Sequence, residues 1–211
     1  MKLHPSDKIP PQKRATLFKL ACEEFAEQGF KQASLNRIIS GAGMSKSSFY
    51  HYFDNKADLF SRALEQAFMP FLQALESFDV STITAQSYWP FLKTMTQEMN
   101  QVANDSPELI VVGRMFYRSQ DNPEERALTQ YLIDLSTRWL VDLIHRGQEL
   151  GLVRSDLPEG LLIDLLMSLN MTMDRWAINN WEGLSEAERV SLWEQGFDLF
   201  VRVLHSGEGL P

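Results

Sequence analysis

The sequence has a single cysteine, Cys22, among 211 residues. An intramolecular disulfide is therefore excluded, and the position of Cys22 between Leu17, Ala21 and Phe25 predicts a small buried hydrophobic side chain. No run of about eighteen apolar residues, the length that crosses a bilayer, occurs in the sequence. The N-terminus also lacks an apolar stretch typical of a signal peptide. Together these absences predict a cytoplasmic protein without a membrane partner.

Residues suited to catalysis or metal binding are also scarce. The sequence has no pair of metal ligands at helical spacing, no phosphate-binding glycine loop and no nucleophile elbow. The four histidines are scattered, at His4, His51, His145 and His205. His145 lies near Asp142 and Glu149, which is typical of a charged helix surface. The sequence therefore predicts a protein that is not an enzyme and that uses neither a metal nor a cofactor.

Strand-like alternation and hairpin dipeptides are absent after Lys56, and the breaks carry signals for helix starts. Ser106-Pro107 and Asn122-Pro123 each place a capping residue before a proline, and Ser185 to Glu188 form a capping box. We therefore predict an all-α fold of nine helices, at residues 12–28, 34–40, 45–52, 55–78, 84–104, 107–120, 123–149, 158–181 and 185–206.

Residues 29–59 have the layout of two short helices joined by a glycine turn. Ser34 and Ser45 are suitable N-caps, and the glycines of the segment Gly41-Ala42-Gly43 permit the left-handed backbone of a tight turn. Phe49 and Phe53, four residues apart, share the face expected to pack on the core. The opposite face is polar and carries Lys46, Ser47, Ser48, Tyr50 and His51, with Tyr52 at its boundary and Lys56 in the first turn of the next helix.

This polar face favours contact with a DNA major groove over the ordinary alternative of a solvated helix surface. Short hydroxyl side chains permit close approach to the groove, and a lysine can donate to phosphates or guanine. The charge supports the same interpretation. Residues 1–60 contain nine Lys and Arg against six Asp and Glu, whereas the remainder contains eleven against twenty-two. A local basic face can bind DNA even in an acidic protein.

The N-terminal segment resembles the TetR family of bacterial transcriptional regulators. The matching segments, in order and spacing, are Phe25–Phe30, Ile38–Ile39, Ala42–Lys46, Phe49–Phe53 and Lys56–Leu59. The resemblance implies a helix-turn-helix DNA-binding domain at residues 1–55 and a ligand-binding and dimerisation domain at residues 56–211. It further implies a homodimeric repressor that binds a palindromic operator in double-stranded DNA and is released by a small-molecule inducer.

By this resemblance, Tyr50 and Lys56 contact phosphates, and Lys46, Ser47, Ser48 and His51 lie near the bases. Many relatives have glycine in place of Ser47 and threonine in place of Ser48, so the operator of a relative cannot be transferred. The candidate DNA-binding residues are Ser34, Ser45, Lys46, Ser47, Ser48, Tyr50, His51, Tyr52 and Lys56.

The last two predicted helices have the pattern of an interface. The segment 161–176 is apolar on nearly its whole circumference, and the last helix has apolar residues spaced by three and four. The apolar residues of both helices could belong to the core of one chain, but in TetR-like proteins these helices form a four-helix bundle between protomers. The candidate dimerisation residues are Leu162, Leu166, Leu169, Met173, Val190, Trp193, Phe197, Phe200 and Leu204.

Aromatic and methionine side chains are concentrated after residue 60. On composition alone they favour an ordinary helical core, whereas the resemblance implies a ligand pocket. The candidate wall residues are Phe71, Trp89, Met95, Met99, Phe116, Tyr117, Trp139, Met167, Asn170, Met171 and Trp176. The candidate polar anchors, which are equally compatible with surface ion pairs, are Arg114, Arg118, Arg138, Asn170, Asp174 and Arg175.

Two alternatives to an inducible repressor stay open. The chain could be a protein-binding adaptor that has lost DNA binding, although Lys46, Tyr50 and Lys56 argue against it. It could also be a regulator that responds to no ligand. For the inducible form, we expect ligand binding to shift the helix that begins near Asn55 and so to change the spacing of the two recognition helices.

Overall fold

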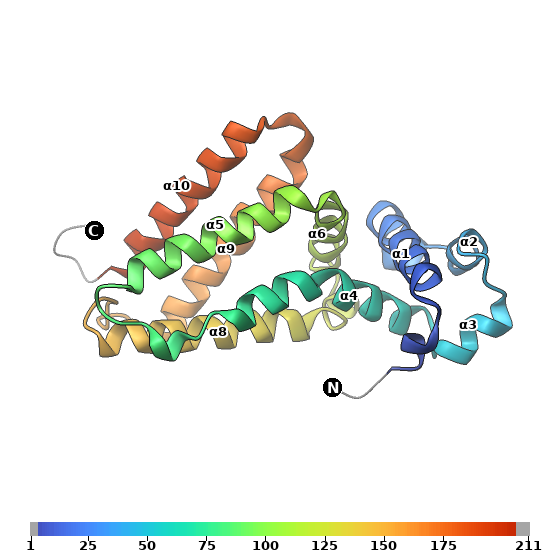
Figure 1. The fold of residues 1–211 in the computed structure, drawn as a ribbon, viewed down its shortest axis with the longest axis horizontal. Coiled ribbons are helices and arrows are strands. Elements are labelled where there is room, and N and C mark those ends of the chain that lie inside the picture. The colour runs from blue at the N-terminus through green and yellow to red at the C-terminus, as the bar shows by residue number, and fades with distance from the viewer. Residues whose placement is uncertain (1–3, 206–211) are drawn as a thin grey trace. The chain divides into compact units, whose positions relative to one another are not determined.

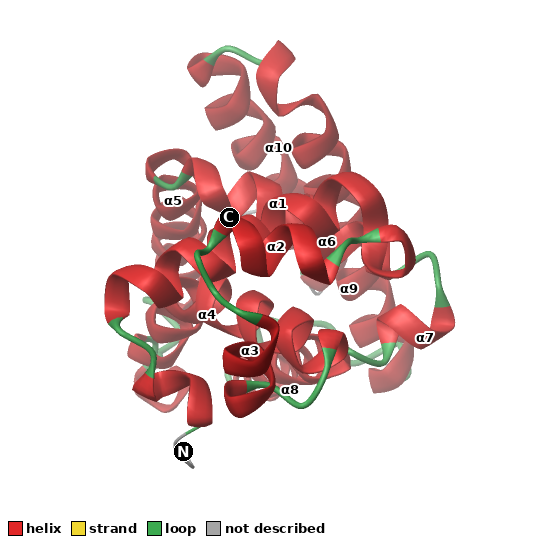
Figure 2. Ribbon diagram, turned by 90° about the vertical axis from the view of Figure 1, so that its right-hand side faces the viewer, coloured by secondary structure: helices red, strands yellow, loops and turns green. Residues whose placement is uncertain are grey.

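The computed structural model describes residues 4–205, except for the side chains of residues 71, 72, 74–77 and 107. Within this range all regular elements are helices, which confirms the predicted all-α class (Figures 1 and 2). The α-helices are α1 (Pro11–Gln32), α2 (Leu35–Gly41), α3 (Lys46–Tyr52), α4 (Lys56–Ser77), α5 (Tyr88–Asp105), α6 (Pro107–Ser119), α7 (Pro123–Arg126), α8 (Gln130–Glu149), α9 (Glu159–Asn180) and α10 (Glu186–Leu204). Three short 3-10 helices are η1 (Pro5–Lys8), η2 (Val80–Thr82) and η3 (Trp181–Gly183). None of these helices combines the length and apolarity that crossing a bilayer requires.

The single helix predicted at 123–149 is wrong, because the described chain has two helices there, α7 and α8, separated by a turn. The turn centres on Thr129, whose hydroxyl donates to the carbonyl of Arg126 at 3.0 Å and accepts from Gln120 Nε2 at 2.8 Å. Thr129 is fully buried. A buried hydroxyl that bonds a nearby carbonyl competes with helical hydrogen bonding, so the helix stops at this position.

The predicted start of the helix at 84–104 is also wrong, since the corresponding helix, α5, begins at Tyr88. Thr84 and Ser87 bond each other instead of extending the helix. The backbone N–H of Thr84 donates to Ser87 Oγ at 2.9 Å, and the N–H of Ser87 donates to Thr84 Oγ1 at 3.3 Å. Hydroxyl side chains in such reciprocal turns hold the backbone out of the helix.

The described chain forms two compact units. One contains the residues up to Met69 together with Pro107–Gln130, and the other contains Pro70–Ser106 together with the residues from Tyr131 onward. Helix α4 therefore supplies residues to both units. The boundary falls at Pro70, inside this helix, where the proline has no N–H to donate. The functional boundary between residues 55 and 56 stays a prediction.

The core of the first unit joins α1, α3 and the beginning of α4 through aromatic side chains. Phe25 and Phe60 meet edge to face at 5.0 Å between ring centroids, and Phe49 stacks on Phe53 at 5.1 Å. All four side chains are almost completely buried. Cys22 is also buried, as predicted, and burial raises the pKa of its thiol to about 12.

The core of the second unit contains fully buried residues from α5, α8, α9 and α10. Tyr88 is its largest buried side chain, and its hydroxyl donates to the carbonyl of Leu143 at 3.1 Å. Burial raises the pKa of this phenol. Gly147 lies directly against the Tyr88 ring, because a Cβ built on this glycine would come within 2.7 Å of Tyr88 Cζ. The glycine thus permits α8 to approach α5 closely.

Candidate nucleic-acid interface

The turn between α2 and α3 has the geometry that the sequence predicts. Ser34 Oγ accepts from the backbone N–H of Arg37 at 3.3 Å, and Ser45 Oγ accepts from that of Ser48 at 3.1 Å. Gly43 has φ +59°, the left-handed conformation that a side chain disfavours. These caps and this glycine define where α2 ends and where α3 begins.

Helix α3 separates its side chains into a buried side and an exposed side. Phe49 is completely buried, whereas Tyr50 exposes 52% of its surface. The two rings meet edge to face, with 5.1 Å between their centroids. The exposed residues of the predicted DNA-binding set are Ser45, Lys46, Ser47, Tyr50 and His51, and the half-buried ones on α3 are Ser48 and Tyr52. One helix face therefore presents hydroxyl, ammonium and imidazole groups together, as base and phosphate readout requires.

Lys56 is placed differently from the other candidates. Its ammonium donates to the carbonyls of Lys31 at 3.2 Å and Ala33 at 3.1 Å, and it lies 4.9 Å from the centroid of the Phe30 ring. A cation at the C-terminal end of a helix satisfies carbonyls that have no helical partner. Lys56 therefore ties the start of α4 to the end of α1 in this structure.

Ser34 is also engaged within the protein. Besides capping α2 with its hydroxyl, it donates its backbone N–H to Glu24 Oε1 at 2.8 Å. Glu24 is buried and forms an ion pair with Arg37 at 2.9 Å. The pair joins α1 to α2 and so positions the turn that precedes α3.

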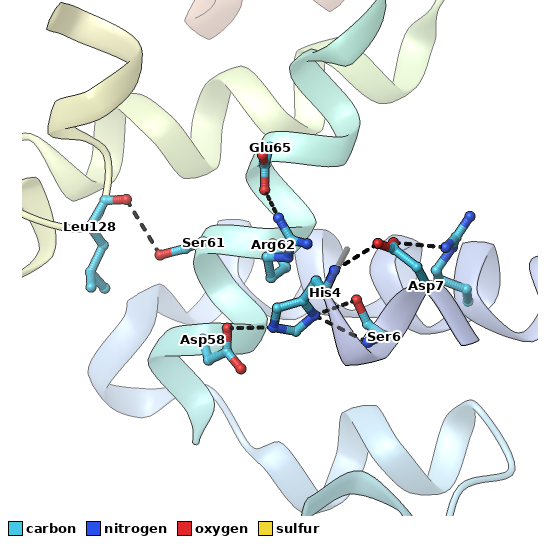
Figure 3. A network of polar contacts seen from close by, with 9 residues as sticks. His4, Ser6, Asp7, Asp58, Ser61, Arg62, Glu65 and Leu128 are labelled. Atoms are coloured by element: carbon cyan, nitrogen blue, oxygen red, sulfur yellow. Dashed lines mark hydrogen bonds and ion pairs between the residues drawn. The ribbon is translucent and has the colours of Figure 1, made fainter. Parts of the chain in front are cut away.

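The short helix η1 was missed by sequence reasoning, and it braces the DNA-binding segment. Its N-cap residue His4 accepts from the backbone N–H of Ser6 at Nδ1, while its Nε2 lies 3.3 Å from Oδ1 of Asp58 on α4 (Figure 3). Asp7 of the same helix accepts from Arg14 of α1 at 3.0 Å. Pro5 at the first helical position was the available signal, but histidine is an unusual cap.

Arg118, a candidate ligand anchor, contacts α1 in the first unit. Its guanidinium donates to the carbonyls of Ala26 at 3.0 Å and Glu27 at 2.7 Å. These carbonyls lie just before Gly29, where the backbone leaves the helical conformation with φ +74°. A Cβ on Gly29 would lie 2.9 Å from Arg118 Nε. The glycine and the arginine together allow α6 to pack against the distorted end of α1.

A cavity of about 190 Å³ lies within the second unit, between α5, α8, α9 and α10. Five of the candidate wall residues line it, namely Met95, Met99, Trp139, Met167 and Asn170. Trp89 lines an adjoining groove instead. Phe116 and Tyr117 belong to the first unit, Met171 and Trp176 are not in the lining, and the side chain of Phe71 lies outside the described residues.

The candidate dimerisation residues divide into three groups. Leu162, Leu166 and Leu204 are fully buried in the core of the chain itself. Leu169, Met173, Trp193, Phe197 and Phe200 line the cavity, and Val190 is 40% exposed. The exposed large apolar side chains on these helices also include Leu161, Leu165, Trp176 and Leu199, none of which is among the candidate dimerisation residues. The contacts with a partner protomer stay a prediction.

Comparisons with known proteins agree with this architecture. Residues 17–63 match the family model for bacterial regulatory proteins of the tetR family. The chain is 23% identical over 164 residues to the HTH-type transcriptional repressor KstR2 of Mycobacterium tuberculosis, covering 78% of this chain and 80% of that protein. It is 22% identical to the fatty acid metabolism regulator protein of Bacillus subtilis, covering 88% and 92% respectively.

Solved structures show the same fold. The structure of the regulator FadR from Bacillus subtilis in complex with stearoyl-CoA matches with a TM-score of 0.72 at 20% identity, covering 90% of this chain and 99% of that one. A SmeT–triclosan complex matches with a TM-score of 0.71 at 18% identity, covering 95% and 97%. These similarities extend along nearly the whole chain, well beyond the helix-turn-helix.

Proposed function

Because the chain belongs to the TetR family of bacterial transcriptional regulators, we propose that it is a homodimeric repressor. In this proposal it binds a palindromic operator through α3 and is released by a small-molecule inducer. The observation that carries the proposal is the exposed side of α3, where Lys46, Tyr50 and His51 are exposed while Phe49 is buried. A short helix with these side chains on one side suits the major groove.

Support for a dimer comes from the apolar side chains that the single chain leaves exposed on α9. Leu161, Leu165 and Trp176 are 47%, 44% and 51% exposed, and their spacing of four and eleven residues places them on one helix face. A helix with such a face is stabilised when a second helix covers it. Two copies related by a two-fold axis would present two recognition helices, which matches the symmetry of a palindromic operator.

Support for induction comes from the cavity and from the course of α4. The cavity lies in the second unit, and α4 supplies residues to both units while beginning just after the recognition helix. In our proposal, ligand in the cavity displaces α4 and thereby changes the spacing of the two α3 helices. A coupling of about 1–3 kcal/mol would change operator affinity by roughly five- to 150-fold.

Selection of bound duplexes from a random DNA library, followed by sequencing, tests the proposal. We expect an inverted repeat whose half-sites are separated by about one helical turn or a multiple of it. Lys46→Ala should reduce enrichment of this motif. Lys93→Ala, which removes a lysine from the second unit, is the matched control and should leave it unchanged. Weak, salt-sensitive binding without a motif would contradict the proposal and favour a protein-binding adaptor.

A further inference from the structure

Most cations of the DNA-binding segment are already engaged within the protein. Residues 1–60 contain nine lysines and arginines, and all except Lys2 belong to the described part of the chain. Most of these donate to backbone carbonyls or pair with carboxylates, namely Lys13, Arg14, Lys19, Lys31, Arg37 and Lys56. The other two, Lys8 and Lys46, are exposed and have no polar partner within the described residues. These two lysines can therefore reach a phosphate without breaking a contact of the fold.

The segment that contains Lys8 runs alongside α3. His4, near its start, has its ring 5.8 Å from that of Phe53, the residue that follows α3. Lys13, near its end, donates its ammonium to the carbonyl of Gly43 at 2.8 Å, in the turn that precedes α3. Between these two contacts, η1 lies against α3. Lys8 is the last residue of η1 and therefore lies beside the proposed recognition helix.

The backbone at Lys8 is held in place by its neighbours. Ile9, the next residue, is almost completely buried and donates its backbone N–H to the carbonyl of Ser6 at 3.0 Å. Asp7, the preceding residue, does not pair with Lys8, because its carboxylate accepts from Arg14 of α1 at 3.0 Å. Since the backbone is already fixed, binding a phosphate would order the side chain of Lys8 alone, which limits the entropic cost of the contact.

We propose that Lys8 is a further DNA-binding residue, whose ammonium donates to a backbone phosphate at the edge of the groove that α3 occupies. The inference rests on the proposed function in taking α3 as the recognition helix. Phosphates line both edges of a groove that holds a helix, so elements beside the helix can contact the DNA backbone. Because η1 precedes residues 17–63, the segment that matches the family model, the family match does not account for this contact.

The salt dependence of operator binding tests the proposal. Fluorescence anisotropy titrations of the full chain with the selected duplex cover about 50 to 200 mM salt, where each phosphate contact contributes about 0.9 to the slope of log affinity against log salt concentration. Lys8→Met should lower this slope by about 0.9 for each bound protomer. The advantage of the wild-type protein should then shrink by about 3.5-fold per protomer over this range. Lys8→Arg, which keeps the charge, should retain the slope. An unchanged slope in Lys8→Met would overturn the inference.

Lys19→Met is the matched control. Lys19 is also exposed and belongs to the same unit, so both substitutions remove one positive charge from an exposed site. Lys19 lines a groove formed by α1, α4 and α6 rather than lying beside α3, so its replacement should leave the slope unchanged. If both variants lost the same slope, the net charge of the unit rather than a contact at Lys8 would control binding, and the inference would be wrong.

Two further measurements distinguish a phosphate contact from a structural role and from base recognition. Because Lys8 has no polar partner within the described residues, Lys8→Met should leave the melting temperature unchanged. Because phosphates carry no sequence information, the motif selected from a random library should also stay the same. A lower melting temperature with an unchanged slope would assign Lys8 to the fold, and a changed motif would assign it to the bases. Either result contradicts the proposal.

The same titration on a duplex of unrelated sequence separates this inference from the proposed function. A phosphate contact does not depend on sequence, so Lys8→Met should lower the slope on this duplex as well. If an operator is recovered but Lys8→Met leaves both slopes unchanged, the inference about Lys8 fails and the repressor proposal stands. If no motif is recovered but Lys8→Met lowers the slope on the unrelated duplex and Lys19→Met does not, Lys8 contacts DNA and the repressor proposal fails.

Discussion

Replacing Lys56 with methionine separates a structural role from a DNA-binding role for this side chain. Methionine keeps most of the aliphatic stem but has no donor. The substitution removes two hydrogen bonds, to the carbonyls of Lys31 and Ala33, and a cation–π contact with Phe30. A hydrogen bond from a charged group contributes about 1.5–3 kcal/mol when well desolvated. Because Lys56 is half-buried and water can replace part of the contact, we expect a net loss of about 1–2 kcal/mol.

Urea unfolding followed by circular dichroism measures this loss. Tryptophan fluorescence is the wrong probe, since all five tryptophans lie in the second unit, whereas Lys56 lies in the first. Lys46→Met is the matched control. Lys46 is exposed and has no polar partner among the described residues, so its replacement should change stability by no more than about 0.5 kcal/mol. In operator binding the order should reverse, with Lys46→Met lowering affinity.

Salt dependence decides between the two roles. A lysine that neutralises one phosphate contributes about 0.9 to the slope of log affinity against log salt concentration. If Lys56→Met has wild-type stability but loses a slope of about this size, the ammonium serves a phosphate, as the family resemblance implies, and the structural interpretation is refuted. If stability falls and the slope is unchanged, Lys56 acts by joining α4 to α1.

Three further predictions concern backbone space and burial. Gly43→Ala should destabilise the protein by about 1–2 kcal/mol in urea unfolding, because φ is +59°; Gly183→Ala, with open space and no positive φ, should not. Gly147→Ala should gain about 1 kcal/mol of helix propensity, but the clash of the new methyl group with Val153 and Tyr88 should cost about 1–3 kcal/mol. A higher melting temperature of this variant would contradict the packing described. Burial raises the pKa of the Cys22 thiol from 9.0 to about 12, so its contribution to the free energy of unfolding is complete below pH 9, where the thiol is protonated in both states. That contribution should decline by about 1.4 kcal/mol per pH unit between pH 9 and 12, and Cys22→Ala should abolish this part of the pH dependence of unfolding.

The local features of the DNA-binding segment were predictable because each cap bonds a backbone group only three residues away. Ser34, Ser45 and Asn55 accept from the N–H groups of the third residue that follows, at 3.3, 3.1 and 3.0 Å. Such short-range contacts can be predicted because a window of four residues contains both partners. The bracing by η1 was not predictable, because His4 meets Asp58, which lies far along the chain. The early end of α7 escaped prediction for the same reason, since it depends on a buried contact between Thr129 and Gln120.

The candidate ligand site was only partly predictable because a cavity is space that packing leaves unfilled. Met95, Trp139 and Met167 line the cavity, yet Met171, four residues after Met167, is not in the lining. Composition identifies residues that suit either a core or a pocket. Which of the two they form depends on how closely α5, α8, α9 and α10 approach, and on Gly196, where a Cβ would come within 2.5 Å of Met173.

Basic residues show most clearly what a sequence leaves ambiguous. Lys13, Lys56, Arg118 and Arg146 all donate to backbone carbonyls that are 23 or more residues away in sequence, including those of Gly43, Ala33, Ala26 and Ile83. A sequence pattern shows that a cation is present but not whether a distant helix end already engages it. For the proposed repressor this distinction matters, because cations that hold helices together would determine where α3 lies, whereas exposed cations such as Lys46 would determine how strongly α3 binds DNA. Substitutions of the two kinds of cation should therefore affect operator affinity differently. An affinity lost by replacing a cation that holds helices together should be recovered by stabilising the fold, whereas an affinity lost by replacing an exposed cation should not.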